Sequence, residues 1–201
     1  MKRDTVRNIA IALIIMLVAS FVITLAGCTS DPLADQYREG TSKNYIAGDG
    51  TVTEFAKESR PSFDSWSGKT ESGLMLDSTA LAGQVVVMNW WYAACAPCRA
   101  EAPDLAKLSE EFKDQGVQFV GVNVRDTAET ALAFDRRFNI TFPSVMEAQS
   151  GAVSLAFSGV VSPQAVPTTL VIDKEGRVSA RILGRIDASI LRTLIQTVVA
   201  E

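Results

Sequence analysis

The chain of 201 residues contains no histidine, and this absence excludes several classes of protein at once. Without histidine there is no Ser-His-Asp or Cys-His catalytic system and no His-ligated zinc, copper or haem site. The chain also lacks a lysine- or arginine-rich block, and residues 28–201 carry 16 basic against 22 acidic side chains. Because nucleic-acid binding depends mostly on neutralising phosphates, this acidic body argues against a nucleic-acid partner. We expect no metal and no cofactor, so any chemistry must use thiols, carboxylates, hydroxyls or the backbone.

Residues 1–27 have the features of an export signal. A short basic segment is followed by 18 uncharged residues, Ile9–Ala26, which as a helix would reach ~27 Å. An uncleaved membrane anchor is therefore one interpretation. The sequence Leu25-Ala26-Gly27-Cys28 resembles the lipobox of bacterial lipoproteins, which implies cleavage after Gly27 and lipid attachment to Cys28. Both interpretations place the body outside the cytoplasm, since basic residues favour the inner side. We predict attachment to the outer face of the bacterial cytoplasmic membrane.

The rest of the chain is interpreted as a tether and one domain. Residues 28–60 are polar and predict a tether, with a short strand at residues 51–55 as an option, and residues 61–201 have the usual size of one domain. Turn signals predict two hairpins, one with strands at 62–67 and 73–77 around a turn at 68–72, and one with strands at 168–172 and 177–183. Between the hairpins, hydrophobic runs predict strands at 84–91 and 117–124 and helices at 96–114 and 127–138. A final helix is expected after Asp187, which caps it. This order predicts an α/β fold with a mixed sheet.

The chemistry of the chain is expected at Cys95-Ala96-Pro97-Cys98, where a buried strand gives way to a helix. The unpaired amides and the dipole of a helix N-terminus favour an anion, so the pKa of the Cys95 thiol should fall below its free value of ~8.5. Cys98 lies one turn into the helix and can close a disulfide with Cys95. The expected reaction is attack by Cys95 on a disulfide, followed by resolution by Cys98.

Other uses of this cysteine pair have less support. A structural zinc site needs four ligands, and haem attachment needs a histidine where Arg99 stands. A static disulfide suits an oxidising compartment and remains an alternative. Thiolates also suit Cu(I), but the histidine and the longer cysteine spacing of related copper-delivery proteins are missing.

The segment Trp90–Pro103 together with Val166-Pro167-Thr168-Thr169 resembles the thioredoxin-like family of extracytoplasmic thiol–disulfide oxidoreductases. The resemblance is to the branch of membrane-anchored reductases that includes cytochrome c maturation proteins. It implies a thioredoxin fold, with a mixed central sheet flanked by helices and an added N-terminal β-hairpin. It also implies that Cys95 is the exposed nucleophile, that Cys98 is the buried resolving thiol, and that Pro167 is a cis proline opposite the disulfide.

The cis proline would turn the backbone of Val166 toward a substrate peptide, which can then pair in β fashion. Trp91 and Tyr92 stand next to the motif and are candidates for the substrate surface, whereas Trp90 is expected to pack in the core. The chain departs from the family at Ala94, where tryptophan is common. It also departs at Asn89, the position of a buried aspartate in cytoplasmic thioredoxins.

Glu101 is a candidate for proton exchange with Cys98. The spacing of Cys98, Glu101 and Leu105 places this glutamate on the apolar stripe of its helix. A carboxyl drawn into apolar surroundings has a raised pKa and can accept or return the proton of the Cys98 thiol. The alternative is a partly solvated glutamate that tunes the local field.

The sequence therefore predicts a lipid-anchored thiol–disulfide oxidoreductase that reduces disulfides of exported proteins, with apocytochrome c as a candidate substrate by resemblance. Such a reductase needs electrons, and the resemblance implies a membrane thiol carrier as their donor. An oxidase or isomerase of the same fold remains open, because related folds differ by ~150 mV without a change of cysteine spacing.

Overall fold

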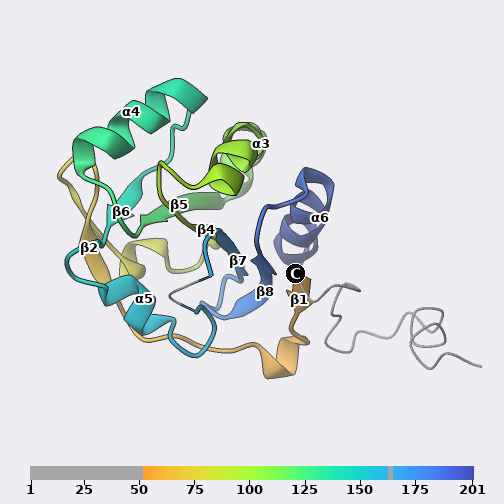
Figure 1. Cartoon of the computed structure of the whole chain (residues 1–201). Coiled ribbons are helices and arrows are strands. Elements are labelled where there is room, and N and C mark those ends of the chain that lie inside the picture. Colours follow the sequence, from red (N-terminus) through yellow and green to blue (C-terminus); the bar gives the residue numbers. More distant parts are fainter. Residues whose placement is uncertain (1–51, 163–164) are drawn as a thin grey trace, which may run out of the picture. The chain divides into compact units, whose positions relative to one another are not determined.

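A six-stranded mixed sheet forms the centre of the computed structural model, which describes residues 52–162 and 165–201 (Figure 1). In spatial order the strands are β1 (Val52–Glu54), β8 (Val178–Leu183), β7 (Thr168–Ile172), β4 (Val85–Trp91), β5 (Val117–Asn123) and β6 (Ser144–Met146). Strands β4, β5 and β6 run parallel, whereas β7 is antiparallel to both β4 and β8. The expected α/β fold with a mixed sheet is confirmed.

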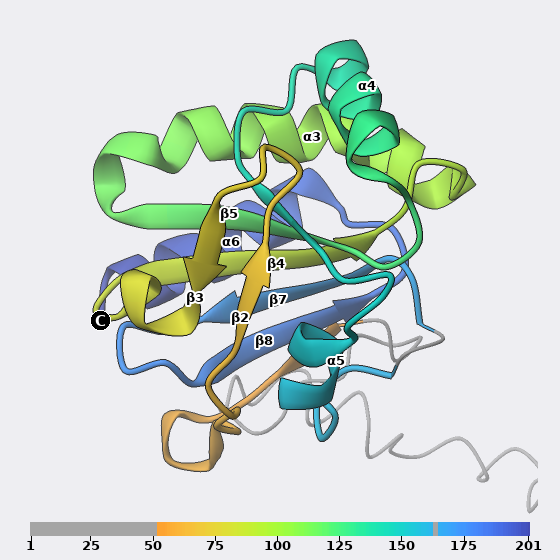
Figure 2. The same ribbon diagram turned by 90° about the vertical axis from the view of Figure 1, so that its left-hand side faces the viewer.

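Helices cover both faces of this sheet. The helical elements are η1 (Lys57–Ser59), η2 (Ser78–Leu81), α3 (Ala96–Phe112), η3 (Lys113–Gln115), α4 (Ala128–Phe138), α5 (Ala152–Ala156) and α6 (Ala188–Val199). Helices α3 and α6 pack together on one face with α4 beside α3, and α5 lies on the other face with a hairpin (Figure 2). The predicted cap is confirmed, because the carboxylate of Asp187 accepts the amides of Ser189 and Ile190.

Strand β4 forms where the sequence is almost continuously apolar, and all seven of its residues are buried. Val85 and Val87 face α3 and α6, while Met88 and Trp90 face the hairpin and α5. A parallel strand covered on both faces needs this composition. The strand carries the chain to the cysteine pair at its carboxyl end.

The added hairpin is confirmed with different boundaries. Its strands are β2 (Ser67–Lys69) and β3 (Met75–Asp77), so the predicted first strand and turn were placed too early. The turn instead closes through a hydrogen bond from the Thr70 amide to the Leu74 carbonyl, 2.8 Å long. Gly68 lies within β2, where a Cβ would approach Val145 Cγ1 to 2.3 Å. This glycine reflects close packing and not a turn.

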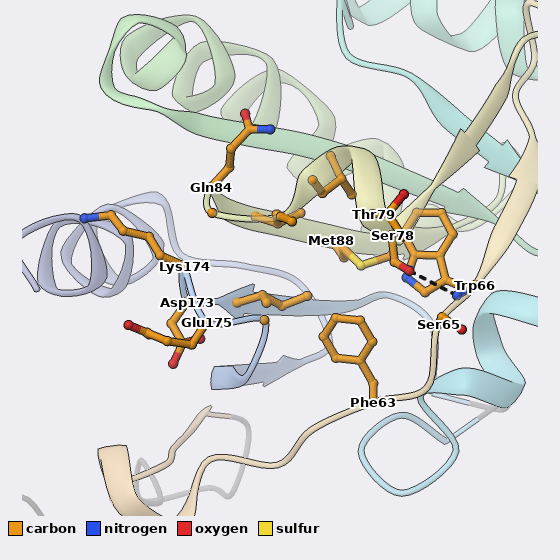
Figure 3. Close-up of a pocket in the computed structure, with 16 residues that line it drawn as sticks. Phe63, Ser65, Trp66, Ser78, Thr79, Gln84, Met88, Asp173, Lys174 and Glu175 are labelled. Atoms are coloured by element: carbon orange, nitrogen blue, oxygen red, sulfur yellow. Dashed lines mark hydrogen bonds between the residues drawn. The ribbon is translucent and has the colours of Figure 1, made fainter.

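A cavity of about 350 Å³ lies where β4 begins and β7 ends (Figure 3). Phe63, Trp66 and Met88 line its apolar wall, and Lys174 and Glu175 stand at its rim. The cysteine pair follows the opposite end of β4, so this cavity does not belong to the redox site.

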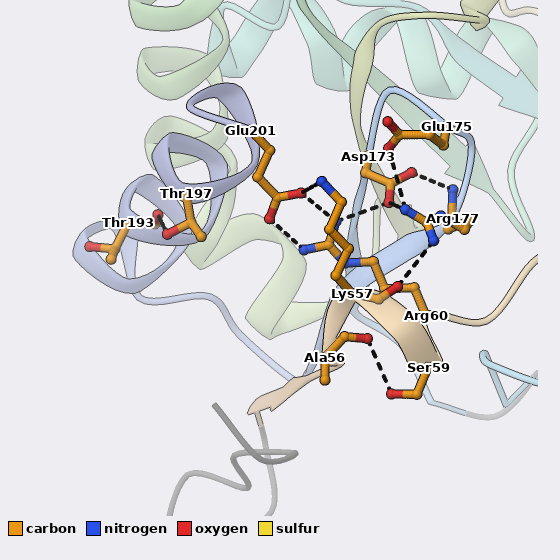
Figure 4. A network of polar contacts seen from close by, with 10 residues as sticks. All are labelled: Ala56, Lys57, Ser59, Arg60, Asp173, Glu175, Arg177, Thr193, Thr197 and Glu201. Carbon is orange, nitrogen blue, oxygen red and sulfur yellow. Dashed lines mark hydrogen bonds and ion pairs between the residues drawn. The ribbon is translucent and has the colours of Figure 1, made fainter. Parts of the chain in front are cut away.

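A network of ion pairs joins Lys57 and Arg60 to Asp173 and to Glu201, which follows α6 (Figure 4). The guanidinium of Arg60 contacts Asp173 at 2.9 Å and Glu201 at 2.6 Å. Strand β1 pairs with β8, beginning with Val52 opposite Ile182. The folded region therefore includes residues that the sequence analysis assigned to the tether, and the optional strand at residues 51–55 is its first strand.

Within the two described ranges, no helix has the length and apolar character needed to cross a bilayer. The predicted export signal and Cys28 lie outside the described residues.

Candidate active site

Cys95 and Cys98 form a disulfide at the point where β4 ends and α3 begins, with their Cα atoms 5.2 Å apart. Cys95 is the N-cap of α3, and its sulfur accepts the amide of Cys98 at 3.2 Å. The predicted position at a strand-to-helix junction is confirmed. An anion on the Cys95 sulfur would meet the unpaired amides and the positive dipole end of α3.

Both cysteines are nearly inaccessible in this disulfide form. Cys95 is 3% exposed and Cys98 is 2% exposed, so the expectation of an exposed Cys95 is wrong for the oxidised pair. The reason is an apolar cluster in which both sulfurs pack with Trp91 and Phe134, and against which Val166 also packs.

The Val166–Pro167 peptide bond is cis, as expected. Val166 is partly buried against the cluster that contains Cys95, and it precedes β7, so it lies outside the sheet ladder. The carbonyl of Pro167 accepts the amide of Gly184 at 2.8 Å, which ties this segment to the end of β8. The structure thus brings Val166 and the cysteine pair together.

Glu101 is completely buried one turn beyond Cys98. One carboxyl oxygen accepts from Asn89 Nδ2 at 2.9 Å, and the other accepts from the amide of Ile186 at 2.9 Å. Burial raises the pKa of Glu101 to about 7, although both hydrogen bonds act to lower it. The expectation of a raised pKa is confirmed, and a partly solvated glutamate is excluded.

Sequence analysis did not foresee the partners of Glu101. The amide nitrogen of Asn89 donates to Glu101 and also lies 3.0 Å from Thr169 Oγ1. Asn89 therefore helps to hold the carboxyl of Glu101 in place. Its adjacency to Glu101 depends on the packing of α3 on β4, which no local pattern reveals.

Trp91 and Tyr92 differ in position. Trp91 is only 4% exposed, its ring centroid lies 4.3 Å from that of Phe134, and its indole N–H donates to Ser144 Oγ at 3.1 Å. Its assignment to the substrate surface is therefore wrong, because alternation along β4 directs it under α4. Tyr92 is partly exposed, with the Arg125 guanidinium 4.2 Å from its ring centroid. Trp90 packs in the core, as expected.

Asp135 on α4 is a second buried carboxyl near the disulfide that the sequence analysis missed. It lines a small cavity together with Cys98. The available signal was its place in the stripe of Ala131, Phe134 and Phe138, four residues after Ala131. Burial, and then the charge of Glu71, raise the pKa of Asp135 to about 7.

Residues 52–162 and 165–201 contain no group of three cysteine or acidic side chains placed to bind a metal ion.

The fold and the cysteine pair define a thioredoxin-fold protein with a Cys-x-x-Cys disulfide at the start of α3. Residues 61–181 match the AhpC/TSA family, and the chain belongs to this family.

The curated relatives include two proteins called thiol-disulfide oxidoreductase ResA. The Bacillus subtilis protein is 32% identical over 120 residues, which are 60% of this chain and 64% of the relative. The Geobacillus kaustophilus protein is 37% identical over 102 residues, which are 51% of this chain and 56% of the relative. The chain thus aligns with less than two thirds of the length of each.

Two solved structures are similar over most of the chain. A secreted thiol-disulfide isomerase from Corynebacterium glutamicum has a TM-score of 0.70 and 26% identity, and the match covers 81% of this chain and all of that one. A DsbF homologue from Corynebacterium diphtheriae has a TM-score of 0.67 and 31% identity, and the match covers 79% of this chain and 99% of that one.

Proposed function

We propose that this protein is an extracytoplasmic thiol–disulfide oxidoreductase that reduces disulfides of exported proteins. The observation that carries the proposal is the Cys95–Cys98 disulfide at a helix N-terminus, packed beside the cis Val166–Pro167 bond. Relatives called thiol-disulfide oxidoreductases support the reaction class.

In the reduced protein, the thiolate of Cys95 attacks one sulfur of a substrate disulfide. A mixed disulfide forms, and the other substrate sulfur leaves as a thiolate that takes a proton from solvent. The sulfur of Cys98 then attacks Cys95 Sγ, the bond to the substrate breaks, and the second substrate sulfur leaves and is protonated. The substrate gains two electrons, and the cysteine pair is oxidised to the observed disulfide.

Three further residues have proposed roles in this cycle. The backbone of Val166, turned by Pro167, pairs with an extended substrate segment. Because Cys95 is buried in the disulfide form, a donor thiol that attacks its sulfur needs the apolar neighbours of the disulfide to move. Glu101, whose pKa is close to neutral, accepts or returns the proton of Cys98.

The location and partners are proposals from the sequence. Lipid attachment at Cys28 would hold the protein at the outer face of the cytoplasmic membrane, near a membrane thiol carrier that reduces the disulfide again. Apocytochrome c is the candidate substrate, on the resemblance to cytochrome c maturation reductases. The secreted nature of the Corynebacterium glutamicum neighbour supports an extracytoplasmic setting.

The alternative is an oxidase or isomerase, which the name of the Corynebacterium glutamicum neighbour favours. Equilibration with glutathione buffers distinguishes the directions, because a reductase should have a potential toward the ~−270 mV of thioredoxin. A potential near −120 mV, roughly that of a strong oxidant, would overturn the reductase proposal.

Cys95→Ala should abolish insulin reduction, while Cys98→Ala should accumulate substrates as mixed disulfides on Cys95. A variant without Cys95 that still reduced insulin would exclude the mechanism.

A further inference from the structure

Three arginine side chains near the disulfide have no acidic partner. Arg99, Arg125 and Arg137 are exposed, and none of them forms an ion pair with an acidic side chain of the described residues. Arg60, by contrast, contacts a carboxylate at 2.6 Å. Because acidic side chains outnumber basic ones in residues 28–201, three arginines without a partner in one region are not explained by composition.

Each of the three arginines lies over an aromatic ring. The guanidinium carbon of Arg125 is 4.2 Å from the ring centroid of Tyr92. Those of Arg99 and Arg137 are 5.5 Å and 5.8 Å from the ring centroid of Phe138. These are the only cation–π contacts among the described residues. The face of a ring attracts a cation without using its N–H groups, which stay available to a ligand.

Both aromatic rings border the disulfide. Tyr92 and Phe138 pack against the apolar cluster that contains Cys95 and Cys98. The carbonyl of Tyr92 also accepts the amide of Cys95 at 3.1 Å, so Tyr92 belongs to the turn that leads into the cysteine pair. The three arginines come from the first turn of α3, the loop after β5 and the last turn of α4. These three segments thus direct positive charge to the same cluster.

The hydrogen bonds of these segments leave N–H groups of the arginines free. Nη1 of Arg99 donates to the carbonyl of Ala93 at 3.3 Å, whereas no described residue accepts a hydrogen bond from the guanidinium of Arg125. The adjacent Asp126 does not pair with Arg125, because its Oδ2 accepts the amide of Ala93 at 2.6 Å and Nδ2 of Asn123 at 2.8 Å. A flat guanidinium with free N–H groups can bind both oxygens of a carboxylate.

We propose that Arg99, Arg125 and Arg137 make the protein select substrate disulfides with acidic side chains beside the reacting cysteine. The inference rests on the proposed function. An extended substrate segment that pairs with the backbone of Val166 passes the cluster against which both aromatic rings pack. A carboxylate of that segment binds the guanidinium of Arg125, and the two other arginines add positive potential. Acidic segments therefore associate faster, and basic segments are repelled.

The test uses three disulfide-linked peptide dimers with blocked ends, which differ only in having glutamate, glutamine or lysine on both sides of the cysteine. The reduced full chain is mixed with each dimer at neutral pH and low ionic strength and quenched with acid. Mass spectrometry then follows the loss of the Cys95 and Cys98 thiols. Each rate is divided by the rate of 2-mercaptoethanol with the same dimer, which removes the dimer's own reactivity. We expect the glutamate dimer to react about 10-fold faster than the lysine dimer, and added salt to reduce this preference.

The variants are compared by the ratio of the glutamate rate to the lysine rate. Arg125→Gln should lower this ratio about 3-fold, as for the loss of one exposed charge contact, and the triple variant with Arg99→Gln and Arg137→Gln should have no preference. The rate with the glutamine dimer shows whether each variant is folded and whether its thiols still react. Lys174→Gln is the matched control, because it removes one exposed positive charge at the opposite end of β4 and should leave the ratio unchanged.

The outcomes separate the inference from the proposed function. Equal rates with the glutamate and lysine dimers, in a wild-type protein that reduces all three dimers, overturn the inference and leave the proposed function intact. A preference for the glutamate dimer that persists in the triple variant also overturns the inference, because other groups then cause it. If the wild-type protein reduces none of the dimers, the proposed function fails and the inference fails with it.

Discussion

Carboxyl groups in two regions of the molecule differ in their partners. Beside the C-terminal helix, Asp173 and Glu201 both contact the guanidinium of Arg60 (Figure 4). Around the disulfide, Glu101 and Asp135 are buried without an ion pair to any described lysine or arginine. The pKa of Glu201 is lowered to about 2, mainly by the hydrogen bond from Arg60. Burial raises the pKa of the carboxyls near the disulfide to about 7.

This difference separates a structural use of charge from a chemical one. A carboxylate paired with arginine stays ionised across the physiological pH range and fastens two segments of chain. A buried carboxyl without a cation changes its protonation near neutral pH, as a partner for a thiol must. Glu101 and Asp135, which have no ion-pair partner among the described residues, are the carboxyls near the Cys95–Cys98 disulfide.

The largest loss of stability should follow from breaking the ion pairs around Arg60. Arg60→Met removes one of the two guanidinium groups that contact the buried Asp173, and Arg177 remains in contact at 3.1 Å. We expect the free energy of unfolding to fall by about 3 kcal/mol, as for other broken buried pairs. Urea unfolding at pH 7 measures it.

Arg192→Met is the control, because its ion pair with Glu111 lies at the surface, where solvent screening leaves it a small contribution to stability. If the two substitutions destabilised the protein equally, the Arg60 network would be no stronger than a surface ion pair.

The next prediction concerns Glu101, one of the two carboxyls near the disulfide that have no ion-pair partner among the described residues. Its pKa is raised from 4.5 to about 7 in the folded protein, so the folded state binds the proton more tightly than the unfolded chain. The corresponding stability is complete below about pH 4.5 and is lost as the pH rises through about 7. This loss of stability with rising pH is about 3 kcal/mol, and it should be absent in Glu101→Gln.

The measurement compares the free energy of unfolding of the oxidised protein at pH 5 and pH 8, in the wild type and in Glu101→Gln. Asp135 titrates in both proteins and so cancels in the difference. An equal decrease between the two pH values in both proteins would show that Glu101 does not titrate in this range.

The region around the disulfide could be predicted from the sequence where the pattern that predicts a feature lies in one short segment. The continuous apolar run of β4, the spacing of Cys95 and Cys98, and the place of Glu101 on its helix stripe all lie within a few turns of chain. The cis form of the Val166–Pro167 bond came from family resemblance and is confirmed.

The ion-pair network around Arg60 could not be predicted, because its residues are distant in sequence. Arg60, Asp173 and Glu201 meet only once the sheet has formed, and no periodicity marks them as partners. Trp91 was misjudged for a related reason: alternation along a strand separates two faces, but only the packing of α4 shows that its face is covered. Gly68 was taken for a turn residue because the contact with Val145 that excludes a side chain lies far along the chain.

The smallest effect is expected at Glu201, and its sign sharpens the comparison between the regions. Its folded pKa of about 2 lies below the ordinary value of 4.5, so its contribution is present above about pH 4.5 and disappears as the pH falls toward 2. Because its side chain is 25% exposed, solvent screening reduces this contribution to about 1 kcal/mol. On acidification from pH 5 to pH 2.5, the wild-type protein should therefore lose about 1 kcal/mol more stability than Glu201→Gln. The Glu101 contribution cancels in this comparison, because both proteins contain that carboxyl. An equal loss in both proteins would show that Arg60 does not hold Glu201 ionised.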